Sequence, residues 1–203
     1  MHNFDWLFQL DGMGFHLINR DLQNPFFDFI MPIITDLGSG GFIWLLAMFL
    51  LAIFGKGTGR KMAFLGAVAL IVGWVLSDAL LKGLFARPRP FLHFADARLL
   101  VAAPHQYSFP SGHSTTAFAP AVAFFRKNKR IGWFALVAAI LIAFSRVYVG
   151  VHYPLDIFGG FILGGAVGYL TVQNESNLDK LVIWSKALLS RFSKKHRGKT
   201  KVS

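Results

Sequence analysis

Long apolar runs separated by short polar segments dominate the chain after residue 24. These runs cover residues 25–55, 62–84, 112–125, 131–147 and 154–172. Several approach the roughly 20 apolar residues that an α-helix needs to cross the hydrocarbon core of a bilayer. The pattern predicts an all-α integral membrane protein, a helical bundle of about five to six transmembrane helices. We expect residues 25–172 to form its single transmembrane domain.

The N-terminal segment differs from the apolar runs. Residues 4–22 mix aromatic side chains with charged or ionisable ones, namely Asp5, Asp11, His16, Arg20 and Asp21. They predict an amphipathic helix lying in the membrane interface, so that residues 1–24 form an interfacial segment. The alternative is a short sixth span within residues 4–34. The opening MHNFDWLFQL has no basic region and a broken apolar run, which predicts no cleavable signal.

Basic residues give the chain a net charge of +11, and they gather in three clusters. The clusters are Lys56, Arg60 and Lys61; Arg126, Lys127, Lys129 and Arg130; and Lys180, Lys186, Arg191, Lys194, Lys195, Arg197, Lys199 and Lys201. All three fall on one side if each intervening run crosses the membrane once. Positive-inside sorting explains this better than nucleic-acid binding, so we expect no nucleic-acid partner. Residues 173–203 then form a basic cytoplasmic tail able to contact anionic lipid.

Polar residues that are costly inside a membrane occur between the last two apolar runs, in the stretch SRVYVGVHYPLD. His152 and Asp156 are four residues apart, and Pro154 suits the first turn of a new helix. A carboxylate at this spacing can fix the imidazole tautomer and leave the other ring nitrogen free to attack. Arg146 offers a planar fork suited to phosphate. Alone, the stretch is equally consistent with a membrane-edge histidine beside a snorkelling arginine.

Two further motifs are present: one at the end of the second apolar run and one at the start of the third. Lys82 is followed after six residues by Arg89-Pro90, and Pro88 and Pro90 disfavour helical geometry for the residue before each of them. The chain must therefore leave the helix and can return Arg89 toward Lys82. Pro110-Ser111-Gly112-His113 opens the next run, with Ser111 as a helix N-cap. The free N–H groups of such a helix end bind anions, and Gly112 would let a phosphate oxygen approach closely.

Three acidic residues and one arginine outside these motifs are further candidates, with Asp28 and Asp36 in the first half of the first apolar run. Asp78 precedes Lys82 by four residues, which predicts an ion pair that orients the ammonium; a rim pair of little energetic consequence is the alternative. Asp28 and Asp36 are either functional acids or residues at the wet outer edge. Arg87 lies outside the motifs and is interpreted as a solvated charge.

In order, the motifs read K-x-x-x-x-x-x-R-P, P-S-G-H and S-R-x-x-x-x-x-H-x-x-x-D, from Lys82 to Asp156. This stretch resembles the type 2 phosphatidic acid phosphatase superfamily, with every signature position filled. The resemblance implies a membrane lipid phosphatase that works through a phosphohistidine. It makes His152 the nucleophile, oriented by Asp156, and makes His113 the residue that protonates the leaving oxygen. The phosphate-binding residues would be Lys82, Arg89, Ser111, Gly112 and Arg146.

The residues alone leave the two histidines interchangeable, although the nearby Asp156 favours His152 as nucleophile. Three cations supplied by the protein make a metal unnecessary for charge, so we expect no metal and no cofactor. Cysteine is absent, which excludes disulfides and thiolate chemistry. The motifs fall opposite the basic loops. We therefore expect the site on the extracytoplasmic face of a bacterial cell membrane.

The short chain resembles small bacterial members acting on undecaprenyl diphosphate; a phosphatidylglycerophosphate or phosphatidate phosphatase is the alternative. A non-catalytic phosphate-lipid binder would lack a motif residue, and a haem bundle would not explain the three cations. Residues 91–109 form either an interfacial lid or a plain connector, with His93 and His105 as bystanders. The sequence predicts no oligomeric state.

Overall fold

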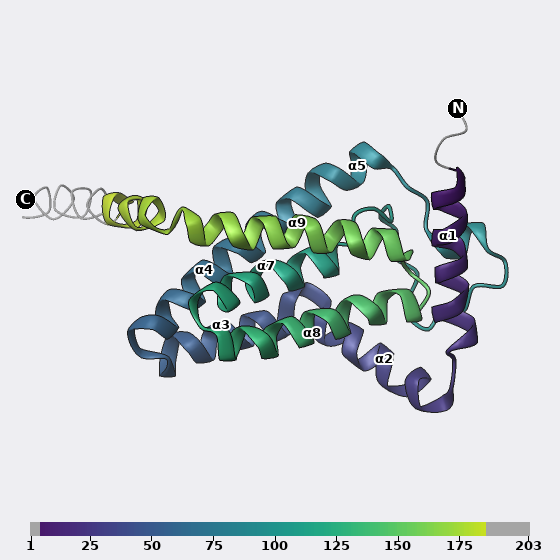
Figure 1. Cartoon of the computed structure of the whole chain (residues 1–203), viewed down its shortest axis with the longest axis horizontal. Helices are drawn as coiled ribbons and strands as arrows, with labels where there is room; N and C mark the ends of the chain where they lie inside the picture. Colours follow the sequence, from purple (N-terminus) through teal and green to yellow (C-terminus); the bar gives the residue numbers. More distant parts are fainter. Residues whose placement is uncertain (1–4, 186–203) are drawn as a thin grey trace, which may run out of the picture.

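The computed structural model describes residues 5–185, and all regular structure in that range is helical. Four stretches are long and apolar enough to cross a membrane: Pro25–Phe54, Lys56–His93, Lys129–Tyr148 and Pro154–Gln173. With the shorter α7 (Gly112–Lys127) they run side by side as an elongated bundle (Figure 1). The predicted all-α membrane bundle is confirmed, and these five long stretches correspond to the five apolar runs.

Irregular turns divide the first two stretches, so their individual helices are shorter than the corresponding apolar runs. The first stretch contains α2 (Pro25–Gly38), a 3₁₀ turn η2 (Ser39–Gly41) and α3 (Phe42–Phe54). The second contains α4 (Lys56–Trp74), a π-helical segment η3 (Val75–Leu81), α5 (Lys82–Phe85) and α6 (Pro90–His93). The remaining two are α8 (Lys129–Tyr148) and α9 (Pro154–Gln173).

Helix α7 is the centre of the bundle and packs against α4, α8 and α9. Its alanines, together with Phe118 and Phe124, are buried in the apolar core. Because neighbouring helices cover it, α7 can also bury hydroxyl groups that bond back to its own carbonyls. Thr115 Oγ1 donates to Ser111 O at 3.0 Å, and Thr116 Oγ1 donates to Gly112 O at 2.8 Å. The polar start of α7 is thus held inside the bundle.

Close approach of α9 to α7 depends on a series of glycines spaced four residues apart. A Cβ at Gly160 would lie 2.7 Å from Ser111 O, and one at Gly164 would lie 2.5 Å from Thr115 O. Gly168 meets the carbonyl of Ala119 in the same way. The small-residue spacing of Gly159, Gly160, Gly164, Gly165 and Gly168 predicts close helix packing, and that packing is present at these three positions. Gly165 faces open space, so the same expectation is wrong for that residue.

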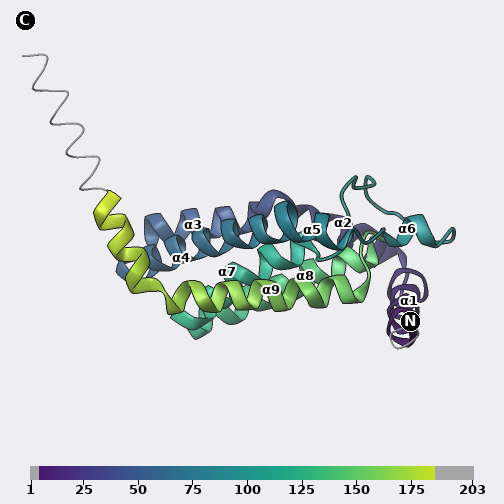
Figure 2. The same ribbon diagram turned by 90° about the horizontal axis from the view of Figure 1, so that it is seen from above.

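The N-terminal segment crosses one end of the bundle instead of joining it. Figures 1 and 2 show α1 (Asp5–His16) lying across the ends of the long helices, and the π-helical turn η1 (Leu17–Asp21) continues it. Phe15 is fully buried and stacks on Phe94 with ring centroids 5.6 Å apart. Trp6, Phe8 and Met13 are exposed. The segment is helical as predicted, and its position in the membrane interface stays a prediction.

Two irregular turns interrupt the first two membrane stretches. Pro32 and the cluster Gly38-Ser39-Gly40-Gly41 predict a kink or break in the first apolar run. The break is present at η2, where Gly40 and Gly41 have left-handed φ values of 59° and 72°. In the second stretch the π-helical η3 precedes Lys82, and Ala86 ends the helix with a left-handed φ of 44°. Where a membrane helix departs from α-helical geometry, the backbone polar groups that it frees need other hydrogen-bond partners. Such departures are frequent at functional sites.

At the opposite end of the bundle, acidic residues of the helical residues 175–185 pair with basic residues of the long helices. Lys61 forms ion pairs with Glu175 and Asp179, and Lys127 contacts Glu175 at 2.8 Å. Residues of the first two basic clusters therefore lie near the described part of the third. Most of that third cluster lies outside the described residues. The apolar residues of the tail predict a surface helix, and two of them, Leu188 and Leu189, also lie outside the described residues.

Candidate active site

The residues of the three motifs lie together at the end of the bundle that α1 crosses. They come from the end of the second membrane stretch, the start of α7, the last turn of α8 and the turn into α9. Most are almost completely buried, namely Lys82, Arg89, Ser111, Arg146, His152 and Asp156. Burying a charge costs free energy unless the charge is paired, so this concentration of buried charges marks a candidate functional site.

His152 and Asp156 form the pair that their spacing predicts. The imidazole Nδ1 lies 3.3 Å from Asp156 Oδ2. The same oxygen accepts the Tyr153 N–H at 2.9 Å and the Ser108 hydroxyl at 2.5 Å. Pro154 occupies the first turn of α9, so Asp156 sits where its carboxylate can bond a free N–H group of that turn.

The other imidazole nitrogen faces Arg89. An Nη1 of this guanidinium lies 3.3 Å from His152 Nε2 and also donates to Val151 O at 2.7 Å. Because a guanidinium can only donate, Nε2 must accept, and the ring proton is therefore on Nδ1, facing Asp156. Burial lowers the pKa of His152 to about 3, although Asp156 opposes the shift. His152 is thus a neutral imidazole at neutral pH, with the lone pair of Nε2 directed toward Arg89.

Three cations converge on this region, and their charges repel one another. Lys82 is paired with Asp78, as predicted, and its Nζ donates to Gln106 Oε1 at 2.9 Å. Arg89 Nε donates to Gln106 O at 2.6 Å. Arg146 Nη1 donates to Thr35 Oγ1 at 2.6 Å, while its buried Nε has no hydrogen-bond partner among residues 5–185. Converging cations and an unpartnered N–H are the features expected of an anion site.

The start of α7 closes one side of the site. Ser111 is the N-cap, as predicted, and its Oγ accepts the Ser114 N–H at 3.3 Å. The Asp78 carboxylate lies against Gly112, where a Cβ would come within 2.8 Å of Oδ1. The absence of a side chain at Gly112 therefore makes room for Asp78, in addition to the predicted approach of a phosphate oxygen.

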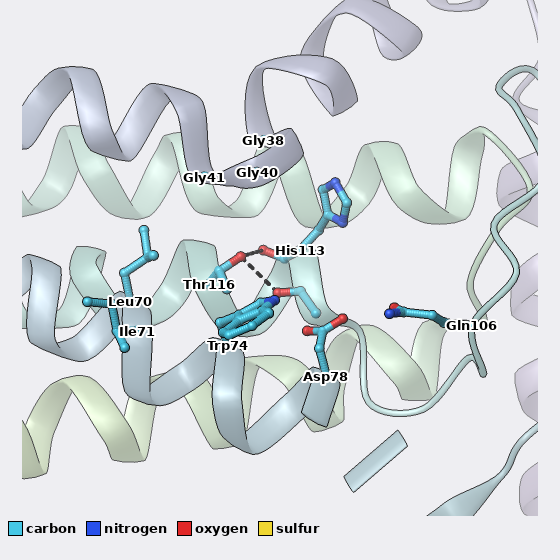
Figure 3. A pocket seen from close by; sticks show the side chains of 11 residues that line it. Gly38, Gly40, Gly41, Leu70, Ile71, Trp74, Asp78, Gln106, His113 and Thr116 are labelled. Atoms are coloured by element: carbon cyan, nitrogen blue, oxygen red, sulfur yellow. Dashed lines mark hydrogen bonds between the residues drawn. The ribbon is translucent and has the colours of Figure 1, made fainter. Parts of the chain in front are cut away.

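His113 lies on the wall of a cavity of about 480 Å³. Figure 3 shows Asp78, Gln106 and His113 toward one end of this cavity and Leu70 and Ile71 toward the other, with Trp74 and Thr116 between them. Gly38, Gly40 and Gly41 of the helix break complete the lining. A cavity with one polar and one apolar end suits an amphiphilic ligand.

This constellation is matched by a known family. Residues 60–180 match the sequence model of the PAP2 superfamily. This range contains all three motifs. The chain belongs to the PAP2 superfamily. The resemblance carried by the motifs is therefore confirmed.

Relatives of this PAP2 protein include two proteins named as undecaprenyl-diphosphatases. BcrC of Bacillus subtilis is 31% identical over 201 residues, which cover 95% of this chain and 96% of that protein. The protein of Sulfolobus acidocaldarius is 35% identical over 136 residues, covering 66% of this chain and 65% of that protein, slightly under two thirds. The crystal structure of Aquifex aeolicus LpxE superposes with a TM-score of 0.64 at 30% identity, covering 85% and 98% of the two chains. The PAP2 protein is a membrane lipid phosphatase.

One prediction about the site of this PAP2 protein is wrong. Arg87 was expected to be solvated, but its side chain is only 17% exposed. Its guanidinium donates to Asp156 Oδ1 at 2.7 Å and to Asp11 Oδ2 at 2.5 Å, and lies 4.0 Å from the centroid of the Tyr153 ring. Arg87-Pro88 repeats the Arg89-Pro90 pattern, and each proline disfavours helical geometry for the arginine before it. The sequence therefore contained a signal that Arg87, like Arg89, leaves the helix.

Other residues around the site were not found from the sequence. Gln106 and Ser108, in the predicted lid or connector, bind motif residues, as described above. Ser39 Oγ lies 3.3 Å from His113 Nε2, and Thr35 binds Arg146. These residues belong to no motif, and serine, threonine and glutamine are too common to stand out in an outer loop or a helix break.

The remaining candidates lie away from the proposed chemistry. Asp28 binds Arg98 at 2.6 Å and accepts the Tyr148 hydroxyl at 2.7 Å, so it ties the outer loop to α8. His93 and His105 are exposed, and their role as bystanders stays a prediction. Within residues 5–185, no three His, Asp or Glu side chains are grouped so that they could hold a metal ion.

Proposed function

We propose that this PAP2 phosphatase hydrolyses undecaprenyl diphosphate to undecaprenyl phosphate and phosphate, on the extracytoplasmic face of a bacterial cell membrane. The observation that carries the chemistry is the neutral His152 held between Asp156 and Arg89. The choice of lipid is supported by similarity to BcrC over nearly the whole chain. The choice of face is supported by the first two basic clusters and Lys180, which lie at the end of the bundle opposite the site.

In the first step, His152 Nε2 attacks the terminal phosphorus with its lone pair. A P–N bond forms as the P–O bond to the lipid breaks, and the electron pair of that bond stays on the leaving oxygen. His113, protonated at the start of the cycle, donates its proton to that oxygen as the bond breaks. The Nδ1–H keeps its bond to Asp156, so the proton that fixes the tautomer does not move.

In the second step, water attacks the phosphorus of the phosphohistidine. The P–N bond breaks, its electrons return to Nε2, and His113 accepts the proton of the water. Phosphate leaves and both histidines are restored. Each step passes through a phosphoryl group whose charge is spread over three equatorial oxygens, so positioning and electrostatic stabilisation do most of the catalytic work.

Lys82, Arg89 and Arg146 supply that stabilisation, together with Ser111 and the Gly112 N–H. One well-placed donor contributes roughly 2.7–4 kcal/mol to barrier lowering in comparable sites. Three such cations make a bound metal ion unnecessary for neutralising phosphate charge. We therefore propose a metal-independent phosphatase without a cofactor.

Phosphatidylglycerophosphate or phosphatidate is the alternative substrate. The observation that favours it is His113 on the cavity wall. An alkoxide is a poor leaving group and needs protonation, whereas the phosphate monoester released from a diphosphate needs it less. A non-catalytic lipid binder is a weaker alternative, because it would not require a nucleophilic histidine with a fixed tautomer.

Phosphate release from purified lipids tests the proposal. The purified enzyme is given undecaprenyl diphosphate, phosphatidylglycerophosphate, phosphatidate or lysophosphatidate in the same detergent, with His152→Ala as the control. We expect the highest kcat/KM on undecaprenyl diphosphate, with undecaprenyl phosphate as the lipid product by mass spectrometry. A higher kcat/KM on a glycerolipid would select the alternative substrate. Lack of release from every lipid would contradict phosphatase activity.

A further inference from the structure

A buried chain of charges connects the N-terminal helix to the catalytic histidine. Asp11 of α1 accepts from Arg87 Nη2 at 2.5 Å, Arg87 Nη1 donates to Asp156 Oδ1 at 2.7 Å, and Asp156 Oδ2 faces His152 Nδ1 at 3.3 Å. The carboxylates of Asp11 and Asp156 are both fully buried. The first two members of this chain lie outside the PAP2 signature.

The contacts divide the two oxygens of Asp156 between separate partners. Oδ1 accepts from Arg87, whereas Oδ2 meets the Ser108 hydroxyl, the Tyr153 N–H and the imidazole. A carboxylate with one oxygen fixed by a guanidinium cannot rotate to exchange its oxygens without breaking that bond. Arg87 thus determines which oxygen faces His152.

Asp11 fixes Arg87 and the backbone of the catalytic turn together. Its Oδ2 holds the second nitrogen of Arg87, and its Oδ1 accepts the Leu155 N–H at 2.8 Å, one residue before Asp156. Leu155 lies in the first turn of α9, where N–H groups lack partners within the helix. Helix α1 therefore holds both the side chain that orients Asp156 and the turn that carries it.

We propose that Arg87 and Asp11 are positioning residues for phosphoryl transfer, acting through Asp156 to keep the proton of His152 on Nδ1 and the attacking lone pair on Nε2. The inference rests on the proposed phosphohistidine function. Arg87 contacts the carboxylates of Asp11 and Asp156, and Asp11 also accepts the Leu155 N–H, so both residues act on Asp156 and the turn that carries it. The planar fork of arginine contacts two carboxylates at once, which a lysine ammonium cannot reproduce with the same geometry.

Kinetics of Arg87→Gln, Arg87→Lys and Asp11→Asn test this role, on whichever lipid the wild-type enzyme hydrolyses. We expect Arg87→Gln to lower kcat about 10–100-fold, the range found for lost outer-shell partners of catalytic ligands, with KM nearly unchanged. Arg87→Lys should recover part of kcat, because it restores the charge. Asp11→Asn should have a smaller effect, and the double variant Asp11→Asn/Arg87→Gln should be no slower than Arg87→Gln alone.

The matched control is Arg20→Gln. Arg20 pairs with Asp96 and so also ties the N-terminal helical segment to the outer loop, but this pair is exposed and does not touch Asp156. We expect wild-type kcat for Arg20→Gln. Thermal unfolding of every variant in detergent shows whether a lower rate reflects less folded protein.

Three results would overturn the positioning role. These are a wild-type kcat for Arg87→Gln, a loss that appears in KM instead of kcat, and effects of Arg87→Gln and Asp11→Asn that multiply in the double variant. Failure of the proposed function would look different. In that case the His152→Ala enzyme would still hydrolyse the lipid, whatever the kcat values of the Arg87 and Asp11 variants.

Discussion

A guanidinium nitrogen of Arg89 lies 3.3 Å from His152 Nε2, the ring nitrogen that does not face Asp156. A phosphoryl group bonded to Nε2 would therefore have its oxygens beside a donor that is already in place. The nucleophile and one of the charges that stabilise its product are arranged as a single unit, before any substrate is bound. Such preorganisation avoids the cost of reorienting donors during the reaction.

The ion pair between Asp78 and Lys82 predicts unequal effects of two substitutions. Lys82→Ala removes a cation that faces the anion site, and we expect a loss of about 10²–10³-fold or more in kcat/KM. Asp78→Asn removes the negative charge but leaves an amide oxygen and Gln106 to accept from the ammonium, so the loss should be about tenfold, in line with the loss of an outer-shell partner. Steady-state kinetics measure both. Wild-type activity of Asp78→Asn would mean that the pair has no orienting role.

The role of His113 predicts a dependence on the leaving group. His113→Ala should lose about 10²–10⁴-fold on a phosphatidate-like monoester, the usual contribution of a general acid. The loss should be smaller on p-nitrophenyl phosphate, whose aryl oxide leaves readily without a proton. His105→Ala is the control, because His105 is exposed and should be neutral on both substrates. Equal losses on the two substrates would remove His113 from the role of acid.

The supply of charge by three cations predicts that turnover survives excess EDTA. Phosphate release is measured before and after extended dialysis against the chelator, with and without added Mg²⁺ or Zn²⁺. The expected rate is the same in all samples. Activity lost to EDTA and restored by a divalent ion would show that Lys82, Arg89 and Arg146 do not suffice.

The distribution of basic residues predicts the orientation of the bundle, and the absence of cysteine makes single-cysteine probes clean. Thr58→Cys lies beside the first basic cluster, and Ala95→Cys lies in the outer loop near α6; both positions are exposed. An impermeant thiol reagent applied to intact cells should label Ala95→Cys and leave Thr58→Cys unmodified until the cells are opened. Labelling of Thr58→Cys in intact cells would reverse the orientation.

Local chemistry explains which parts of the site the sequence predicts. Asp78 and Lys82, like His152 and Asp156, are four residues apart on one helix or turn, so spacing alone brings them together. Ser111 caps α7 because a serine before an apolar run can accept a free N–H. The same local logic predicts the five long helical stretches and the glycine break at η2.

Long-range partners explain what the sequence does not predict. Arg87 meets Asp11 across 76 residues, and Arg146 meets Thr35 across 111 residues. The positions of such partners depend on how α1 crosses the bundle and how α2 packs beside α8, which no spacing rule supplies. In the sequence, Arg87 consequently looks like any charged residue beside a membrane helix. Its pairing with Asp11 is visible only in the folded structure.

The most direct test of the account is the identity of the phosphorylated residue. Labelled substrate is mixed rapidly with the enzyme, quenched without acid and digested, and the label is mapped to a peptide. We predict an acid-labile, alkali-stable phosphohistidine at His152, and no labelled intermediate or turnover in His152→Ala. Label on His113, or turnover by His152→Ala, would contradict the assignment of His152 as the nucleophile.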